Sequence, residues 1–208
     1  MTQMDLDDER SLVAGLRAGD TDAFDVVYDA YRPRVLGFLL RMSRNRTLAE
    51  DLLDETWLRL VRHAHALRPD TRIGPWLFTV ARNLYWTARR DGLAHETQAP
   101  QLLALWPSVA PWPSPFDLAA AGELERRVER ALSTLSPHHR EVILLIAHEG
   151  LTPAEAAEVC GVAPEALRQR LSRARATLAE TSCVLRHATV ASSRSSCGLS
   201  IVMSRIPS

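Results

Sequence analysis

Apolar residues recur at helical spacing along most of the first 91 residues. The runs AFDVVYDAYRPRVLGFLLRMS (23–43) and AEDLLDETWLRLVRHAHAL (49–67) place apolar side chains three and four positions apart, which is the repeat of an amphipathic helix. The pattern holds between Ser11 and Asp91 with one interruption, at residues 68–75. We therefore expect a compact helical domain with boundaries at residues 9–92.

The rest of the chain divides into a linker, a second helical domain and a tail. Between Gly92 and Ala119 lie five of the 12 prolines and almost no charge, a composition typical of irregular structure, so residues 93–121 are expected to be a linker. Helical spacing returns in residues 122–181, whereas residues 182–208 are rich in serine and aperiodic. The predicted fold is all-α: two small helical domains, a proline-rich linker and a disordered C-terminal tail.

Residues 151–178, LTPAEAAEVCGVAPEALRQRLSRARATL, have the dimensions of a helix-turn-helix. Thr152, Pro153 and Glu155 are a start signal for the first helix, as N-cap, first-turn proline and capping-box acid, and Gly161 is expected to end it. The second helix has a single apolar face, made of Leu167, Leu171, Ala174 and Leu178. In DNA-binding proteins of this kind the second helix lies in the major groove, so its opposite face is a candidate for reading base pairs.

The candidate reading residues are polar or basic and fall into two groups. Arg168, Gln169, Ser172 and Arg173 are expected to turn toward the groove floor, whereas Arg170 and Arg175 are expected to lie nearer the phosphates or the helix flanks. Guanidinium and amide groups suit base edges and phosphates. The alternative is a salt-bridged surface helix. It is the weaker explanation because only Glu165 and Glu180 could offset four arginines.

The net charge of zero conceals a segregated distribution of charge. Residues 1–31 hold eight acids and two arginines, a net of −6, whereas residues 32–92 hold twelve arginines and six acids, a net of +6. A neutral chain is a poor nonspecific coat for nucleic acid, but a local basic region can still form a nucleic-acid site. Together with the second helix of the helix-turn-helix, the chain has two candidate sites for nucleic acid.

A helix is predicted from Pro75 to Arg90, inside the basic region. Its apolar side comprises Leu77, Val80, Ala81, Leu84 and Ala88, and its outward side comprises Arg82, Asn83, Trp86, Arg89 and Arg90. An exposed aromatic ring beside an amide suits unpaired bases, because rings stack on bases and amides bond to base edges. A core position for Trp86 is left open as the alternative, and Trp76 is expected to be buried.

The run AEDLLDETWLRLV (49–61) predicts a helix with an acidic surface. Its expected buried stripe is Leu52, Leu53, Trp57 and Leu60, and its acidic side is Glu50, Asp51, Asp54 and Glu55. A solvated helix face is the alternative interpretation of these acids. Neither a Glu-x-x-His pair nor a glycine-rich phosphate loop accompanies them in the sequence, so an enzyme is not expected.

Four segments in order along residues 9–180 resemble the extracytoplasmic-function (ECF) group of bacterial sigma-70 initiation factors. They are LVAGLRAGDTDAFDVVYDAYRPRVLGFLLRM, AEDLLDETWLRLVR, PWLFTVARNLYWTARRD and LSPHHREVILLIAHEGLTPAEAAEVCGVAPEALRQRLSRARATL. Many regulators share a helix-turn-helix, but the combination of AEDL-x-x-ET, W-L-x-x-x-ARN and an SRAR helix is specific. The resemblance implies that the first domain binds RNA polymerase and the minus-10 promoter element, and that the last domain reads the minus-35 element.

The resemblance also implies roles for individual residues. The acidic helix is expected to meet the coiled coil of the largest polymerase subunit, and the polymerase flap region is a second expected contact. The implied polymerase-binding residues are Asp51, Leu52, Asp54, Glu55 and Leu58; the implied minus-10 residues are Arg72, Arg82, Asn83, Trp86, Arg89 and Arg90. Residues 68–74 are expected to capture a flipped base. The family usually has an amide where this chain has Asp54, so hydrogen bonding there is expected to differ.

Two other function classes stay open at this point. One is a helix-turn-helix transcriptional regulator that acts on a palindromic operator without core polymerase, and the other is an interaction or enzyme domain that carries a helix-turn-helix. An anti-sigma factor is left open as a further partner.

No cofactor, disulfide framework or metal site is expected. The three cysteines, Cys160, Cys183 and Cys197, form no C-x-x-C pair and are odd in number, and Cys160 is expected to be a small buried thiol. No apolar run approaches the length of a membrane span, and the N-terminus is acidic rather than signal-like. We therefore expect a cytoplasmic protein.

Overall fold

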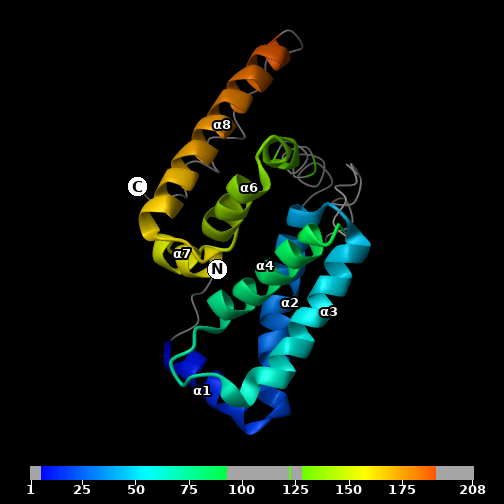
Figure 1. Ribbon diagram of the computed structural model, residues 1–208, viewed down its shortest axis with the longest axis vertical. Helices are drawn as coiled ribbons and strands as arrows, with labels where there is room; N and C mark the ends of the chain where they lie inside the picture. The colour runs from blue at the N-terminus through cyan, green and yellow to red at the C-terminus, as the bar shows by residue number, and fades with distance from the viewer. Residues whose placement is uncertain (1–5, 93–121, 123–127, 191–208) are drawn as a thin grey trace. The chain divides into compact units, whose positions relative to one another are not determined.

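The computed structural model describes residues 6–92, 122 and 128–190, and every regular element in these ranges is a helix (Figure 1). This confirms the predicted all-α class. The chain forms two compact units, residues 1–97 with 154–161 and residues 98–153 with 162–208. The predicted linker at 93–121 lies outside the described residues, and the predicted domain boundaries stay a prediction.

The N-terminal part of the first unit contains four α-helices. They are α1 (Leu6–Ala18), α2 (Thr21–Ser43), α3 (Arg46–His63) and α4 (Ile73–Arg90), with a short 3-10 turn η1 (Ala64–Ala66) after α3. Helix α2 packs against α1, α3 and α4, and α3 also packs against α4 (Figure 1). The predicted start of the last of these helices at Pro75 is two residues late.

The sequence pattern predicted one interruption between Ser11 and Asp91, and this was wrong, because helices also end at Gly19 and at Arg44. Gly19 has φ +76°, the left-handed conformation that glycine adopts most easily, and Asp20 then caps α2 by accepting a hydrogen bond from the Asp22 amide. Arg44 is also left-handed, with φ +53°. The apolar repeat runs through both breaks, so periodicity alone does not reveal them.

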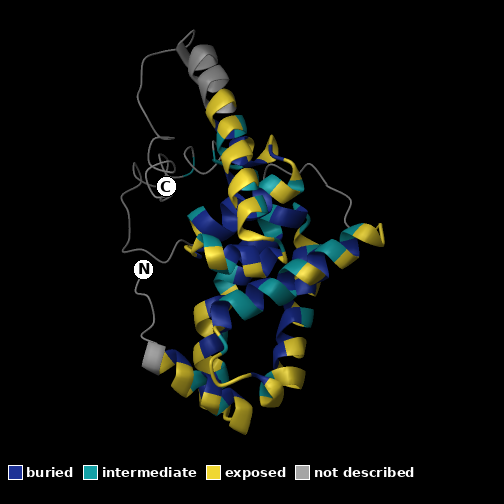
Figure 2. Ribbon diagram, turned by 60° about the vertical axis from the view of Figure 1, so that its left-hand side comes forward, coloured by how far each residue is buried: buried dark blue, intermediate teal, exposed yellow. Residues whose placement is uncertain are grey.

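The core of this part is built from the faces that the pattern predicted to be apolar. Leu52, Leu53, Trp57 and Leu60 of α3 are buried, as are Leu77, Ala81, Leu84 and Ala88 of α4. Phe38 of α2 meets Phe78 of α4 edge to face, with ring centroids 5.6 Å apart. Buried and exposed positions alternate along each helix (Figure 2), which is the amphipathic arrangement expected for a small helical domain.

In the second unit, residues 128–133 are helical and are followed by α6 (Pro137–Ile143), a π-helical turn η3 (Leu144–His148) and the long helix α8 (Pro164–Val190). Helix α6 packs against α8. The side chain of Arg140 in α6 is buried and donates hydrogen bonds to the carbonyls of Leu132, at 3.1 Å, and Leu135, at 3.2 Å. It thereby satisfies carbonyl groups at the end of the preceding helix.

The helix-turn-helix begins and turns where the sequence predicts. Helix α7 (Pro153–Cys160) starts at the predicted proline, and Gly161 follows with φ +62°. Helix α8 starts at Pro164 and continues past residue 181, where the tail was expected to begin, because residues 182–190 contain neither glycine nor proline. Cys160 is buried, as predicted. None of the helices in the described part of the chain is long and apolar enough to cross a membrane.

Candidate polymerase and promoter interfaces

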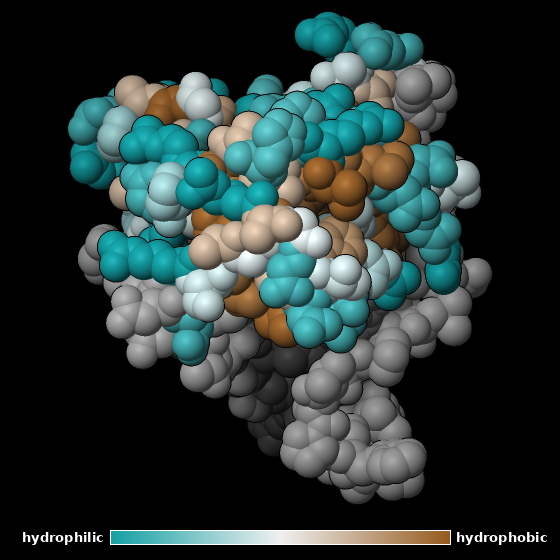
Figure 3. Space-filling model, turned by 90° about the horizontal axis from the view of Figure 1, so that it is seen from below, coloured by the Kyte–Doolittle hydropathy of each residue, from teal (hydrophilic) through white to brown (hydrophobic). Residues whose placement is uncertain are grey.

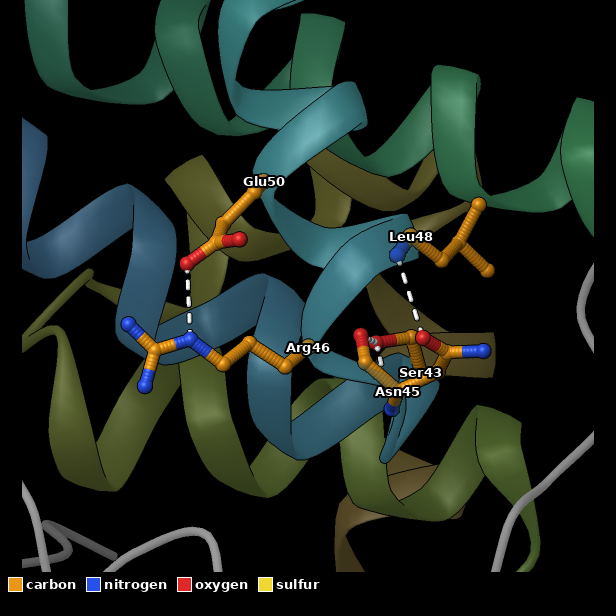
Figure 4. Close-up of polar contacts among 5 residues, drawn as sticks. All are labelled: Ser43, Asn45, Arg46, Leu48 and Glu50. Carbon is orange, nitrogen blue, oxygen red and sulfur yellow. Dashed lines mark hydrogen bonds and ion pairs between the residues drawn. The ribbon is translucent and has the colours of Figure 1, made fainter.

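The first turn of α3 is held by local hydrogen bonds (Figure 4). Asn45 is the N-cap and accepts a hydrogen bond from the Leu48 amide at 3.1 Å, while the Ser43 hydroxyl donates to the Asn45 carbonyl at 3.0 Å. Arg46 pairs with Glu50 one turn further on, with Nε and Oε1 2.8 Å apart. The cap stabilises the start of α3, and the ion pair directs the charge of Glu50 toward Arg46.

The outer face of α3 carries the acids predicted to bind polymerase. Asp51 and Asp54 are exposed, and Glu55 is partly exposed and pairs with Arg59 at 3.1 Å. Leu52, which the same prediction included, is buried in the core and has little surface for a partner. The charge available to a docking partner on this face therefore lies mainly on Asp51 and Asp54.

The second half of this face is apolar. Leu58, a predicted polymerase-binding residue, is 48% exposed, and Val61, one turn later, is 59% exposed. Val26 on the adjacent helix α2 is 51% exposed. Apolar side chains also reach the surface among hydrophilic ones in Figure 3. The sequence analysis missed Val26 and Val61, although the spacing of three between Leu58 and Val61 on a polar face was a signal for them.

Helix α4 presents the predicted polar face beside its buried side. Asn83 and Arg90 are exposed, whereas Arg82, Trp86 and Arg89 are partly exposed. Arg82 donates a hydrogen bond from Nη1 to Oδ1 of Asn83 at 3.0 Å. This contact engages the amide oxygen of Asn83 as an acceptor.

Two tryptophans of α4, Trp76 and Trp86, are neither fully buried nor fully exposed. Trp86 is half-buried and packs edge to face on Tyr85, with ring centroids 5.4 Å apart, so part of its ring is open to solvent and part is supported. Trp76 is also partly exposed, so the expectation that it is buried was wrong. It lies in the first turn of the helix, where fewer neighbouring side chains cover it.

The loop before α4 carries the remaining predicted minus-10 residue. Arg72 is the N-cap residue of α4, and its Nε donates to Oε2 of Glu9 at 3.0 Å. Arg68 pairs with Asp70 in the same loop through two hydrogen bonds of 3.1 Å. Two shallow hollows adjoin the loop; they are lined by Arg10, Ala14, Arg17, Pro69 and Asp70, and by Glu9, Arg10, Asp70, Thr71 and Arg72.

Helix α8 has the phase that the sequence predicted. The four residues expected at the groove floor, Arg168, Gln169, Ser172 and Arg173, are exposed, whereas Arg170 and Arg175 are partly buried. The opposite face of Leu167, Leu171, Ala174 and Leu178 is buried. Arg168 pairs with Glu165 at 2.9 Å, but both side chains are well exposed, so a base or a phosphate could replace this partner at little cost.

Two segments of the chain match known families. Residues 27–92 match sigma-70 region 2, and residues 125–178 match sigma-70 region 4. The RNA polymerase sigma factor CarQ of Myxococcus xanthus is 38% identical over 157 residues, which cover 76% of this chain and 87% of CarQ. The chain belongs to the sigma-70 family of RNA polymerase sigma factors.

Further relatives place this sigma factor in the ECF group. The ECF RNA polymerase sigma factor SigM of Bacillus subtilis is 30% identical over 74% of this chain and 91% of SigM. The sigma factor RpoE from Bartonella quintana, solved in complex with the anti-sigma factor NepR, has a TM-score of 0.57 and 27% identity over 76% of this chain and 94% of RpoE. The structure of CnrH with the cytosolic domain of CnrY has a TM-score of 0.63 and covers 85% of this chain and 97% of CnrH; at 24% identity it supports the fold.

The family assignment decides between the function classes left open above. A sigma factor directs RNA polymerase to promoters, so this ECF sigma factor has core polymerase and promoter DNA as its partners. A regulator that acts without polymerase is not favoured.

Proposed function

We propose that this ECF sigma factor divides promoter recognition among three helices. Helix α3 docks on core polymerase, α4 with the loop 68–72 captures unpaired bases of the minus-10 element, and α8 reads the minus-35 duplex. The observation that carries the proposal is the polar face of α4, where exposed Asn83 lies next to half-buried Trp86. An amide and a supported aromatic ring suit bases that have left the duplex.

The docking part of the proposal rests on charge and apolar surface together. Asp51 and Asp54 would face the basic coiled coil of the largest polymerase subunit, and Leu58 would bury its exposed surface beside them. Complementary charges favour encounter and correct register, while burial of apolar surface stabilises the complex. The partly buried Glu55, held by Arg59, would contribute less than the two aspartates.

The energetics of strand opening require polymerase. Opening a duplex loses about 1.4 kcal/mol of stacking per base step, so a bubble of ten pairs costs on the order of 10 kcal/mol. Capture of a few bases, at about 1–3 kcal/mol each, cannot offset this cost. The sigma factor would therefore select the site and trap the first unpaired bases, while the polymerase holds both strands and performs the catalysis.

The proposed roles also imply whether the chain is an enzyme, where it acts and which further partners it has. It makes or breaks no covalent bond in the proposed scheme, so it is not an enzyme. Because bacterial polymerase transcribes in the cytoplasm, the sigma factor would act there. The flap region of polymerase would contact the C-terminal domain, which matches sigma-70 region 4. An anti-sigma partner, present in the solved RpoE complex, stays a prediction for this chain.

Run-off transcription on genomic fragments tests the proposal. Core polymerase with the sigma factor should start transcripts at specific sites, and the isolated sigma factor should bind promoter duplex weakly. Replacement of Asp51 and Asp54 by arginine should weaken core binding by several kcal/mol, because like charges replace complementary ones. A tight footprint of the isolated protein on a palindrome, with no specific transcript from the holoenzyme, would contradict the proposal.

A further inference from the structure

Glu9 of α1 is an acid buried beside the start of α4. Only 7% of the residue is exposed, although it belongs to the strongly acidic N-terminal stretch of the sequence. One carboxylate oxygen, Oε1, accepts the Ile73 amide proton at 2.9 Å, and the other, Oε2, accepts from Nε of Arg72 at 3.0 Å. A single side chain thus bonds to both the backbone of α4 and the arginine before it.

The start of α4 requires an acceptor from elsewhere. The first amide groups of a helix lack partners within the helix, and the N-cap side chain usually supplies one. The N-cap here is Arg72, whose side chain has no acceptor and makes no capping bond. Glu9, 64 residues earlier in the chain, replaces the missing cap, and its negative charge suits the positive end of the helix dipole.

Tyr31 of helix α2 also packs against the start of α4. A Cβ atom added at Gly74 would lie 3.2 Å from both Cε1 and the hydroxyl of Tyr31, so α4 begins in close contact with this ring. Burial raises the pKa of Tyr31, with the charge of Glu9 adding to the effect and those of Arg34 and Arg72 opposing it. Glu9, Tyr31 and Arg72 therefore form one electrostatically coupled group at the start of α4.

Arg72 is the member of this group that reaches solvent. Its side chain is 44% exposed, and it lines a shallow hollow together with Glu9, Arg10, Asp70 and Thr71. Two carboxylates hold this guanidinium: Glu9 accepts from Nε at 3.0 Å, and Glu155 of α7 pairs with Nη1 at 2.8 Å. An arginine held in this way is preoriented, which reduces the entropy lost when its exposed part binds a base or a phosphate.

We propose that Glu9 is a positioning residue for promoter opening: its buried carboxylate holds Arg72 and the first turn of α4 in the geometry that captures the first unpaired base. This inference rests on the proposed function of α4 and of the loop 68–72. Glu9 itself touches no DNA in the proposal. It acts through Arg72, so its loss should impair opening of the duplex and leave polymerase docking intact.

The variant Glu9→Gln separates positioning from folding. Glutamine keeps an oxygen that can accept from the Ile73 amide, but it removes the charge that holds Arg72 at Nε, while Glu155 still pairs with Nη1. The matched control is Asp8→Asn, which removes one charge from the adjacent, exposed position of the same helix. Each variant is assembled with core polymerase and assayed on a promoter duplex and on the same promoter with a premelted minus-10 element.

Glu9→Gln should slow open-complex formation on the duplex by about tenfold, as expected for the loss of one charge-assisted hydrogen bond. Premelting should restore most of the rate, and core affinity and thermal melting should stay near those of Asp8→Asn. In a double-mutant cycle with Arg72→Ala, Glu9→Gln should add little to the loss that Arg72→Ala already causes, because the charge of Glu9 acts through Arg72.

Three outcomes would contradict either the positioning role of Glu9 or the proposed function of α4, and the assays distinguish them. Equal opening rates for Glu9→Gln, Asp8→Asn and the unmodified chain would overturn the positioning role. An equal loss on duplex and premelted templates, with weaker core binding, would assign Glu9 to folding and also overturn it. Absence of specific transcription by the unmodified holoenzyme would instead contradict the proposed function of α4.

Discussion

Helices α4 and α8 present polar faces of different kinds on the same type of amphipathic helix. The face of α4 combines an amide, a half-buried indole and arginines that contact residues of their own helix, as Arg82 contacts Asn83. The face of α8 offers exposed Arg168, Gln169, Ser172 and Arg173, and the ion pair between Arg168 and Glu165 is itself well exposed. The difference matches two tasks: an unpaired base is held by stacking at a fixed place, whereas a duplex is read by long side chains that enter a groove.

The two helices also differ in how their first turns are fixed. Helix α4 is capped by Glu9, a side chain distant in the sequence, whereas α8 begins after a left-handed glycine and a proline at its first position. Proline is preorganised for the first helical turn and needs no distant partner. Capture of a single base demands more exact placement than attraction to a groove, and the long-range cap of α4 is consistent with this demand.

Removal of the capture residues of α4 should give the largest effect. Trp86→Ala combined with Asn83→Ala should destabilise the open complex by about 2–4 kcal/mol, through the loss of one stacked base and one hydrogen bond. Permanganate reactivity of minus-10 thymines should fall accordingly. Trp86→Phe is the control, because it retains a ring. Unchanged permanganate reactivity in the double variant would exclude this face from base capture.

Substitution of the groove-floor arginines of α8 should have the next largest effect. Arg168→Ala or Arg173→Ala should cost about 1–3 kcal/mol and relax the preference at particular base pairs, as expected for a lost bidentate contact. Selection of randomised minus-35 elements with each variant holoenzyme measures this preference. If both variants retain the original base preferences and lose only salt-dependent affinity, the assignment of the reading face is wrong.

Arg175 provides a contrast within the same helix. It is partly buried on the flank, so Arg175→Ala should weaken binding to all sequences equally and reduce the slope of log affinity against log salt concentration by about one. Holoenzyme binding to two unrelated promoters over a salt series is the measurement. A change in base preference without a change in slope would move Arg175 to the reading face.

The smallest expected effect concerns Tyr31 at the start of α4. Burial raises its pKa, so the folded state favours the neutral phenol and its stabilising contribution is complete below the ordinary tyrosine pKa of about 10. As the pH rises through the raised pKa this contribution is lost, and the free energy of unfolding should fall. Denaturant unfolding at about pH 9 and pH 11 should show a smaller fall for Tyr31→Phe. Equal falls would indicate that Tyr31 does not cause the alkaline loss.

The sequence predicted features that depend on local spacing. The buried stripe of α3, the polar face of α4 and the phase of α8 all follow from residues three and four apart, and the structure places them accordingly. The roles of these residues in binding polymerase and DNA stay predictions. The breaks at Gly19 and at Arg44–Asn45 were missed because apolar periodicity continues through them, although glycine and asparagine are themselves helix-boundary signals.

Features that depend on distant contacts could not be predicted from spacing. Glu9 is one acid among eight in residues 1–31, and only the fold brings it to the amide of Ile73. Arg140 likewise gave no sign in the sequence that it would be buried, because its partners are backbone carbonyls eight and five residues earlier. A charged side chain is expected at the surface unless it is paired. Only the tertiary structure shows which groups pair with Glu9 and Arg140.

The central claim, that α4 handles the unpaired strand and α8 handles the duplex, is tested most directly by one comparison of templates. Trp86→Ala and Arg173→Ala holoenzymes are assayed for transcription on a promoter duplex and on the same promoter with its minus-10 element premelted. The account predicts that premelting restores Trp86→Ala toward the unmodified rate and leaves the defect of Arg173→Ala in place. Equal rescue of both variants, or rescue of Arg173→Ala alone, would contradict it.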